Sequence, residues 1–433
     1  MGGLFGQYQR WMGLNDADVA WLEAVGRAFA AAGGSGSVIL ADVALEAGLR
    51  AAGVSVTRAD IQVSSPTLSG IDPATGYIED PVNSATGNFV LPETDVVFGG
   101  PSQGLAISRM YNSTLAAAYD EPEACGVLGP GWSTILDQRL IVTDEQARWV
   151  RDDGREIVFP LTGRNGASGS PTAEGCHTVE GPWRAAQDNV WISRGDAADL
   201  AGVQGATVAG PVWIVADNTG SRLIFTAEGA WVGSTSGAGD GVWIERHDGV
   251  ITSMHSEWGR SVDLFYAQGR LAKAVASDGR SVSYAYDSQG RLVEVTRPDG
   301  VHHYQWDGWL LSQVIDASGV AQCVNTFDAL GRIRTQRDAT GHLTRFTYLP
   351  GGVTVADDGQ GHHSNTWISD ARGRTVGIID ADGQRTSMRY DRYGNLVGAT
   401  DRAGKVIRHT YNERGHRTRT TLPTGGVIEY GWD

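Results

Sequence analysis

The stretch Tyr286-Asp287-Ser288-Gln289-Gly290-Arg291-Leu292 decides the fold, because its pattern recurs through the second half of the 433-residue chain. Each copy begins with a residue that we call the anchor, usually an aromatic followed by Asp or Asn, and continues to a Gly that Arg often follows. Successive anchors lie 20 or 21 residues apart, a regularity that indicates a repeat architecture. The anchors are Tyr266, Tyr286, Trp306, Phe327, Tyr348, Ser369, Tyr390, Tyr411 and Trp432.

A second glycine turn lies about halfway between successive anchors, as at Asp299-Gly300 and Asp382-Gly383. Two turns in each unit imply two strands in each unit. These turns favour hairpins, because Asp can bond its own backbone two residues on and Gly accepts a positive φ. In segments such as 292–296, apolar and polar residues alternate along the chain, which is typical of a strand with one buried face. We therefore predict a mainly β fold, in which an antiparallel strip of hairpins runs continuously from about Asp80 onward.

The repeat also suggests structural roles for its recurring residues. We expect the anchors to be largely buried and to stack along one line of the sheet, since they share one phase. We expect Asp to cap the turn rather than to bind calcium, because each copy supplies one carboxylate about 20 residues from the next. Arg is expected to pair with this Asp in a stacked row, the alternative being a ladder for sugars or phosphates. The predicted structural positions are Tyr266, Gly269, Arg270, Tyr286, Asp287, Gly290, Arg291, Trp306, Asp307, Phe327, Asp328, Gly331, Arg332, Asp370, Gly373, Arg374, Tyr390, Asp391, Gly394, Tyr411, Asn412 and Gly415.

Upstream of the repeats the pattern changes twice. Residues 1–63 have the apolar spacing of a helical region, which either packs on the β region or docks a secretion chaperone. Residues 64–80 are rich in Ser, Pro, Gly and Asp and indicate a linker. Residues 81–248 contain short aromatic strands between glycine turns, and residues 249–433 hold the repeats and end inside one. We predict these four ranges as the domain organisation.

Composition excludes several classes of protein. The net charge of −15 argues against a nucleic-acid scaffold, which needs clustered Lys and Arg. Cys125, Cys176 and Cys323 lack the spacing of a zinc site or a disulfide framework. The first residues lack the basic and apolar regions of a Sec signal, so we expect export by another route. Charged residues interrupt the apolar stretch 38–56, so we expect no membrane span.

The repeats resemble the YD repeats of Rhs proteins. Upstream, the segments DPVNSATGNFVLPETD (80–95) and Gly129-Pro130-Gly131-Trp132-Ser133 resemble the domain that precedes those repeats in bacterial polymorphic toxins. The resemblance extends from about residue 72 to the end of the chain. It implies a β-sheet strip that spirals into a hollow shell, enclosing a C-terminal toxin domain that a secretion system or toxin complex delivers to another cell.

The sequence also departs from the family's pattern. It has no DPxGLxGG-type segment, at which the family cuts its toxin free. We therefore expect the partner to be a toxin domain or a further shell chain absent from this sequence, with a chaperone or delivery component at the N-terminal helices. We expect the protein to be secreted or to lie at the cell surface.

The sequence shows no catalytic constellation. His302-His303 and His362-His363 could suggest metal sites, but adjacent residues on a strand point to opposite faces, so we interpret them as surface histidines near turns. We predict no enzyme activity, no metal and no cofactor. Several tryptophans could stack on sugar rings or pack the sheet: Trp183, Trp191, Trp213, Trp231 and Trp243.

We interpret the chain as a non-catalytic scaffold that helps to enclose and deliver a C-terminal toxin. The alternative is a cell-surface or wall-associated module that binds glycans or another cell through its repeats. Eight repeat intervals of two strands give about 16 strands, which at roughly 4.8 Å apart would close at a radius of about 12 Å. We therefore expect that this chain alone cannot enclose a folded domain.

Overall fold

The computed structural model describes residues 69–100, 104–118, 125–161, 182–196, 208, 210–238, 240–359 and 364–432. The predicted helices within 1–63 and residues 64–68 of the predicted linker lie outside these residues. Within them the fold is mainly antiparallel β, as the repeat pattern predicts. The helix α3, Ser113–Ala117, is only five residues long.

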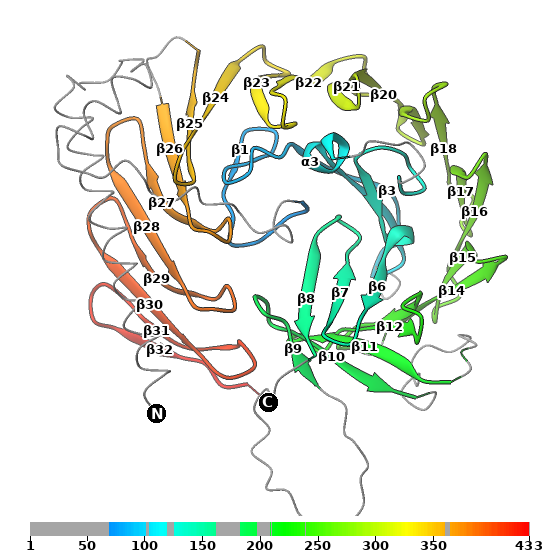
Figure 1. The fold of residues 1–433 in the computed structure, drawn as a ribbon, viewed down its shortest axis with the longest axis horizontal. Helices are drawn as coiled ribbons and strands as arrows, with labels where there is room; N and C mark the ends of the chain where they lie inside the picture. Colours follow the sequence, from blue (N-terminus) through cyan, green and yellow to red (C-terminus); the bar gives the residue numbers. More distant parts are fainter. Residues whose placement is uncertain are drawn as a thin grey trace, which may run out of the picture.

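A single antiparallel sheet of 24 strands, β9 to β32, curls into a closed ring in which the strands follow one another in chain order. Figure 1 shows this ring nearly face-on. The ring strands are β9 (Trp183–Arg184), β10 (Val190–Gly195), β11 (Val212–Asp217), β12 (Arg222–Thr226), β13 (Trp231–Thr235), β14 (Gly241–His247), β15 (Val250–Ser256), β16 (Ser261–Ala267), β17 (Arg270–Ala276), β18 (Ser281–Tyr286), β19 (Leu292–Arg297), β20 (Gly300–Asp307), β21 (Leu310–Ile315), β22 (Ala321–Phe327), β23 (Ile333–Asp338), β24 (Leu343–Leu349), β25 (Val353–Asp357), β26 (Ser364–Ser369), β27 (Thr375–Ile379), β28 (Arg385–Tyr390), β29 (Leu396–Thr400), β30 (Val406–Tyr411), β31 (Arg417–Thr421) and β32 (Val427–Glu429).

The described residues between 69 and 161, which we call the inner segment, lie inside this ring (Figure 1). They form three small sheets, β1-β2, β3-β4-β5 and β6-β7-β8. Their elements are β1 (Tyr77–Ile78), β2 (Val82–Asn83), β3 (Val90–Val97), β4 (Ala106–Asn112), α3, β5 (Trp132–Thr134), the 3-10 helix η4 (Ile135–Asp137), β6 (Arg139–Val142), β7 (Gln146–Val150) and β8 (Glu156–Pro160).

The ring and the inner segment share one hydrophobic core. Ring strands alternate, so that Val282 and Tyr284 point inward and are buried while Ser283 is exposed. Inner-segment residues such as Phe89 and Trp132 belong to the same buried cluster as these inward side chains. The inner segment therefore fills the ring as a core fills a globular domain.

Two predictions about the sheet are wrong. The sheet is not continuous from Asp80, because the ring begins at β9 and the upstream strands form separate sheets. The strip is also wider than the repeats alone suggest, because strands β9 to β15 extend it. At roughly 4.8 Å between neighbours, 24 strands close at a radius of about 18 Å, which leaves room for the inner segment. The chain therefore encloses a folded part of itself.

The predicted boundary at residue 249 rests on the repeat pattern and stays a prediction. The ring already begins at Trp183, which the pattern placed in the region before the repeats. We propose that the inner segment and residues 182–432 are the two structural units of the described chain.

Candidate functional site: the interface between the ring and the inner segment

Several repeats share a turn geometry that starts at an Asp. In the turn after β22, Asp328 Oδ1 accepts hydrogen bonds from the backbone N–H of Leu330 at 2.9 Å and of Arg332 at 3.0 Å. Asp328 Oδ2 accepts a third from Arg332 Nε at 2.7 Å. Gly331 takes a φ of +74°, where a side chain would be strained. Asp thus closes the turn and holds the Arg beside it.

The repeat arginines connect neighbouring repeats. Arg374 pairs with Asp370 and donates a 2.6 Å hydrogen bond to the carbonyl oxygen of Asp391 in the next repeat. Its guanidinium also lies 5.2 Å from the ring centre of Tyr390. Because these arginines are engaged within the sheet, the structure favours the stacked row over a ladder for sugars or phosphates. The same Asp and Arg pairing occurs at Asp287 with Arg291 and at Asp328 with Arg332.

Other copies use variants of this turn. Asn395 replaces Arg as the donor to Asp391 Oδ2, at 2.8 Å. Asn412 accepts the two backbone N–H groups in its turn in place of Asp. Arg270 instead reaches inward and donates to the carbonyl oxygen of Gly126 at 2.6 Å. Asp307 is exposed at the end of β20.

A β-bulge beside most anchors shifts the pairing between the two strands of the repeat. At Ala285 and Tyr286 the register shifts, so that Tyr286 lies opposite Leu292. Tips of five anchors then donate to a backbone carbonyl of the preceding repeat. These bonds are Tyr286 Oη to Leu271 O (2.7 Å), Trp306 Nε1 to Leu292 O (2.8 Å), Tyr348 Oη to Ile333 O (2.7 Å), Tyr411 Oη to Leu396 O (2.8 Å) and Trp432 Nε1 to Arg417 O (2.8 Å). A polar tip that is buried in the sheet needs an acceptor of this kind. The anchors Tyr286, Phe327, Tyr390 and Tyr411 are half-buried, whereas we expected them to be largely buried.

The residue opposite the bulge turns its N–H toward the inner segment. This amide belongs to the residue that follows the Gly and Arg of the repeat, or to its equivalent. The bonds are Leu271 N to Val127 O (2.9 Å), Leu311 N to Tyr111 Oη (2.9 Å), Ile333 N to Gly87 O (3.0 Å) and Thr375 N to Ala74 O (2.9 Å). These four ring amides thus hold the inner segment at separate points along its length. Sequence reasoning missed this role, because a free amide leaves no trace in the side-chain pattern.

A buried charge network crosses the same interface. Arg109 of β4 donates to Asp95 Oδ2 at 2.9 Å and to Tyr304 Oη of the ring at 2.7 Å. Tyr284 of the ring donates to the same Asp95 oxygen at 2.9 Å. The side chains of Arg109 and Asp95 are fully buried. Trp132 lies under the guanidinium, 4.5 Å away.

The electrostatics of this network keep Arg109 charged. Burial disfavours the cation, but Asp95, Tyr304 and Glu93 together raise the pKa of Arg109 above its usual range. Burial and the neighbouring Asp95 carboxylate raise the pKa of Tyr284 well above its ordinary value, so its hydroxyl stays a donor. Asp95 is therefore held by the Arg109 cation and the Tyr284 hydroxyl, while the Tyr304 hydroxyl accepts from Arg109.

Asp137 positions the loop that meets Leu271. Its carboxylate accepts the backbone N–H of Val127 at 3.1 Å and of Thr134 at 3.0 Å. Burial raises the pKa of Asp137 to about 6, although these two donors act in the opposite direction. The folded state therefore holds this proton more tightly than an ordinary carboxylate would.

We predict that Asp137 makes folding more favourable at low pH. Its folded pKa of about 6 exceeds the ordinary value of 3.8, so its contribution is present at acid pH and is lost as the pH rises through 6. Urea unfolding of the wild type and of Asp137→Asn at about pH 5, 6 and 7 measures this. The free-energy difference should shift toward the wild type as the pH falls. A difference that stays constant would contradict the prediction.

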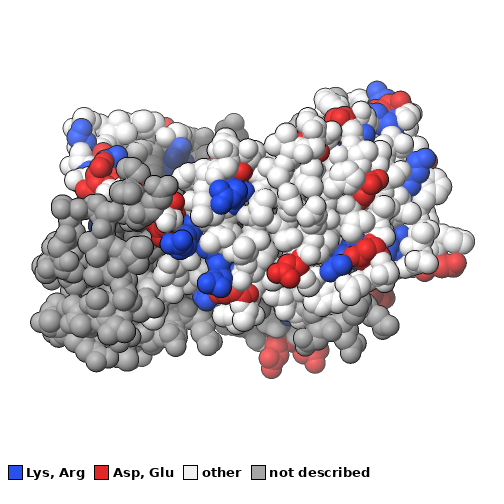
Figure 2. All heavy atoms as spheres, turned by 90° about the horizontal axis from the view of Figure 1, so that it is seen from above, with Lys and Arg blue, Asp and Glu red and all other residues white. Residues whose placement is uncertain are grey.

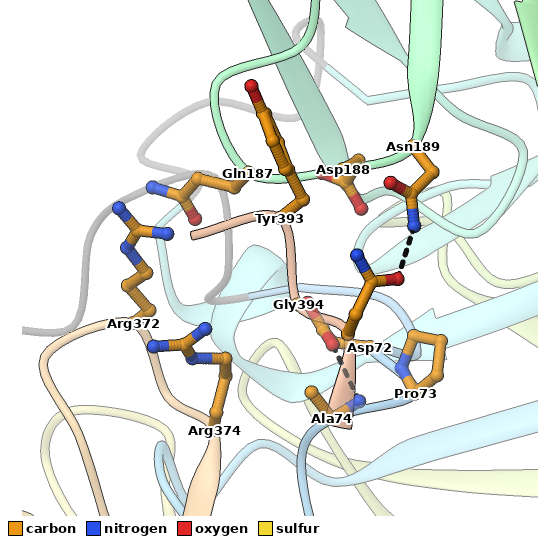
Figure 3. Close-up of a pocket in the computed structure, with 11 residues that line it drawn as sticks. Asp72, Pro73, Ala74, Gln187, Asp188, Asn189, Arg372, Arg374, Tyr393 and Gly394 are labelled. Carbon is orange, nitrogen blue, oxygen red and sulfur yellow. Dashed lines mark hydrogen bonds between the residues drawn. The ribbon is translucent and has the colours of Figure 1, made fainter. Parts of the chain in front are cut away.

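The ring closes at a seam between the β9-β10 turn and the last repeats. Arg184 stacks on Tyr393 and donates to the carbonyl oxygen of Glu413 at 2.7 Å. Asn189 donates to Asn395 Oδ1 at 2.7 Å. A pocket of about 250 Å³ lies at this seam. Arg372 lines it on one side and Asp72 on the other (Figure 3).

The seam pocket is electrically balanced. Arg155 binds Asp72 at 2.8 Å and Asp188 at 2.6 Å, so both acidic side chains of the lining already have a cation. Arg374 is paired with Asp370. The residues that line the pocket come from the inner segment and from both ends of the ring.

The described residues contain no group of three or more His, Cys, Asp or Glu side chains that could hold a metal ion. His303 is exposed as predicted, but His302 is buried at the interface, so its assignment to the surface is wrong. His362 and His363 lie outside the described residues, as does Cys176. Burial raises the pKa of Cys323 to about 12, which keeps this thiol protonated.

The tryptophans pack the fold more than they present a surface. Trp213 and Trp231 are buried, and Trp183 lies against Trp213 with the ring centres 6.2 Å apart. Trp243 stacks on His255. Trp191 is half-buried near Arg184.

Comparison with known families agrees with this geometry. A family model described as RHS Repeat matches residues 265–302, 370–406 and 390–427, which contain the anchors and the Asp-capped turns. The chain is an Rhs/YD-repeat protein. A second family model, described as a domain of unknown function (DUF6531), matches residues 79–159 of the inner segment.

Curated relatives of this Rhs/YD-repeat protein are much longer. The tRNA nuclease WapA of Bacillus subtilis (strain 168) is 24% identical over 329 residues, which are 72% of this chain and 13% of that protein. The probable deoxyribonuclease RhsB of Dickeya dadantii (strain 3937) is 32% identical over 146 residues, 33% of this chain and 10% of that protein. The Rhs/YD-repeat chain thus spans about a tenth of the length of these relatives.

Solved structures similar to this Rhs/YD-repeat protein include toxin complexes. The complex TcdB2-TccC3-Cdc42 matches 66% of this chain and 16% of its own, with 14% identity and a TM-score of 0.28. The Photorhabdus luminescens Tc holotoxin pore carrying a TccC3 mutation matches 86% of this chain and 19% of its own, with 12% identity and a TM-score of 0.28.

Proposed function

We propose that this chain is a non-catalytic section of a toxin shell, in which the ring is filled by the inner segment and a C-terminal toxin domain is carried beyond it. The observation that carries the proposal is the closed 24-strand ring with its own residues fixed inside it by backbone hydrogen bonds and a buried charge network. A ring filled in this way closes one end of a container. The predicted partner is a C-terminal toxin domain or further shell chain.

The proposed lack of catalysis is supported by the distribution of chemistry in the described residues. Charged side chains of the repeat turns pair with one another, as Asp370 does with Arg374, and Arg109 pairs with Asp95 in the inner segment. WapA and RhsB are named as nucleases, but this chain matches only about a tenth of each. We propose that nuclease activity in such proteins belongs to parts that this chain does not match.

The proposed location is outside the producing cell or at its surface. Among the described residues, no helix has the length and apolar character needed to cross a membrane. Figure 2 shows Lys and Arg interspersed with Asp and Glu on one face of the molecule, without a basic stripe of the kind that binds nucleic acid. A chaperone at the N-terminal helices and glycan partners stay predictions.

The proposal predicts what the native polypeptide contains. Mass spectrometry of the protein from its producing organism should find this chain continuous with further repeats and a short, unrelated domain that is toxic when expressed alone. The chain described here should neither be toxic nor cleave tRNA or DNA in a gel assay. A wall-anchoring or lectin region in place of the toxic domain would favour the surface-module alternative, and cleavage abolished by one substitution would refute the non-catalytic role.

A further inference from the structure

We propose that the seam pocket binds a small zwitterion, a molecule that carries one carboxylate and one ammonium group, as a free α-amino acid does. The bound molecule bridges the inner segment, the β9-β10 turn and the last repeats, and it thereby stabilises the closed ring. The inference concerns the described chain alone and does not depend on the identity of any toxin.

The pocket lies where three parts of the chain meet. Its lining comes from 72–74 of the inner segment, from 187–189 of the β9-β10 turn, and from Arg372, Arg374 and 393–395 of the repeats. Its volume of about 250 Å³ is below the roughly 300–1,000 Å³ of pockets for drug-sized ligands, so it fits a small metabolite. Because a ligand there touches all three parts, its binding also stabilises the contact between them.

The pocket wall that carries Asp72 and Asp188 has one negative charge in excess. Both carboxylates lie on the same nitrogen, Arg155 Nη2, which is 2.8 Å from Asp72 and 2.6 Å from Asp188. One cation therefore serves two anions. Burial raises the pKa of Asp188, and the Asp72 carboxylate acts in the same direction, against Arg155. This wall is thus short of positive charge, which the ammonium group of a ligand supplies.

The opposite wall, which carries Arg372 and Arg374, has one positive charge in excess (Figure 3). Arg374 is paired with Asp370 at 2.6 Å. Among the described residues Arg372 forms no ion pair, and its guanidinium donates to the carbonyl oxygen of Arg392 at 2.6 Å. Burial and the neighbouring Arg374 lower the pKa of Arg372 from its ordinary value. A ligand's carboxylate therefore finds an uncompensated guanidinium here, the group that binds carboxylates most strongly.

The other polar groups at the pocket are bonded to one another. Asn189 donates to Asn395 Oδ1 at 2.7 Å, as Figure 3 shows, and accepts from Arg184. Asn395 in turn donates to Asp391 Oδ2 at 2.8 Å. Arg184 and Asp391 add one cation and one anion, so they leave no net charge. A ligand therefore meets the excess charges of the two walls.

These two excess charges disfavour simpler ligands. A lone anion satisfies Arg372 but lies opposite the uncompensated carboxylate of Asp188, and a lone cation does the reverse. A neutral sugar leaves both charges without a partner. The Tyr393 ring, on which a sugar could stack, is already covered by Arg184. A zwitterion is complementary to both walls at once.

Amide hydrogen exchange with L-alanine as the probe tests the proposal. Exchange of peptides that cover 183–195 and 370–396 is followed by mass spectrometry in up to about 10 mM L-alanine. Protection of these peptides should rise about tenfold once the L-alanine concentration is about ten times its Kd, and should then depend on concentration as for one site. Peptides from β18 and β19 should not change. Sodium acetate and methylammonium chloride, alone or mixed at the same concentration, should not protect, because neither links the two walls.

Four variants locate the effect. Arg372→Gln and Asp188→Asn each remove one excess charge and should abolish the protection by L-alanine. Arg389→Gln and Asp382→Asn change the same types of group at exposed positions away from the pocket lining, and should keep it.

The proposal would be overturned if L-alanine did not protect the seam peptides, or protected β18 and β19 equally. Equal protection by acetate, by methylammonium or by glucose would also overturn it, as would protection that persists in Arg372→Gln or Asp188→Asn. The comparison of L-alanine with acetate, methylammonium and glucose uses the wild type alone, so it decides the proposal even if a variant does not fold.

Discussion

Replacing Arg109 by Leu is expected to lower the free energy of unfolding by about 3–5 kcal/mol, the range for breaking a buried ion pair from one side. Arg109 and Asp95 are both fully buried, and the substitution leaves the Asp95 carboxylate with one hydroxyl donor, Tyr284, and with Arg297 at 3.6 Å. The stacking of the guanidinium on Trp132 is lost as well. Urea unfolding followed by circular dichroism measures the effect.

Two controls separate charge from volume in this experiment. Arg148→Leu removes a partly exposed pair with Glu156, in which the arginine side chain is 39% exposed, and should cost less than about 1 kcal/mol. The double variant Arg109→Leu with Asp95→Leu removes both charges and should recover part of the loss. If Arg109→Leu costs no more than Arg148→Leu, the network does not stabilise the interface.

Gly129→Ala is expected to have the second large effect, because the added methyl group would clash with the ring where the inner segment touches it. Gly129 has a φ of +92°, and a Cβ there would lie 2.6 Å from the carbonyl oxygen of Gly290 in the ring. Backbone cannot yield as a flexible side chain can. We expect a loss of about 1–3 kcal/mol from the overpacked contact, added to the strain of alanine at positive φ.

Gly279→Ala is the matched control. Gly279 has nearly the same φ, +91°, but a Cβ there meets nothing within 4 Å. The two variants therefore share the backbone strain and differ in the contact with the ring. Unfolding in urea should place Gly129→Ala below Gly279→Ala in stability, and hydrogen exchange should show lost protection near Leu271. Equal stabilities would show that the loop does not press on the ring as described.

The repeat could be predicted in detail because its causes are local. Asp328 caps its own turn and Gly331 takes a positive φ within the same few residues, so both leave a signal in the sequence. The alternation in strands such as β18 likewise reports one buried face. These local rules predict hairpins and their spacing.

The arrangement of the inner segment could not be predicted from the same rules. Phe89 and Trp132 have the pattern of short strands whether they lie in a wall or inside one. Their position depends on backbone amides such as that of Ile333, which any residue could supply. The environment of His302 is equally non-local, since its neighbour Arg297 pairs with Glu93 of the inner segment.

The order of the contacts between the inner segment and the ring has a consequence for how the chain acquires its structure during synthesis. Gly126 meets Arg270, 144 residues later, whereas Thr75 meets Gly373, 298 residues later. Thr75 leaves the ribosome before Gly126 and also waits longer for its partner. At roughly 5–20 residues per second, Thr75 waits about 15–60 s, with apolar surface available to chaperones or to aggregation. Contacts between residues this far apart in sequence also predict slow folding. The ring strands can pack on the inner segment only after they have been synthesised.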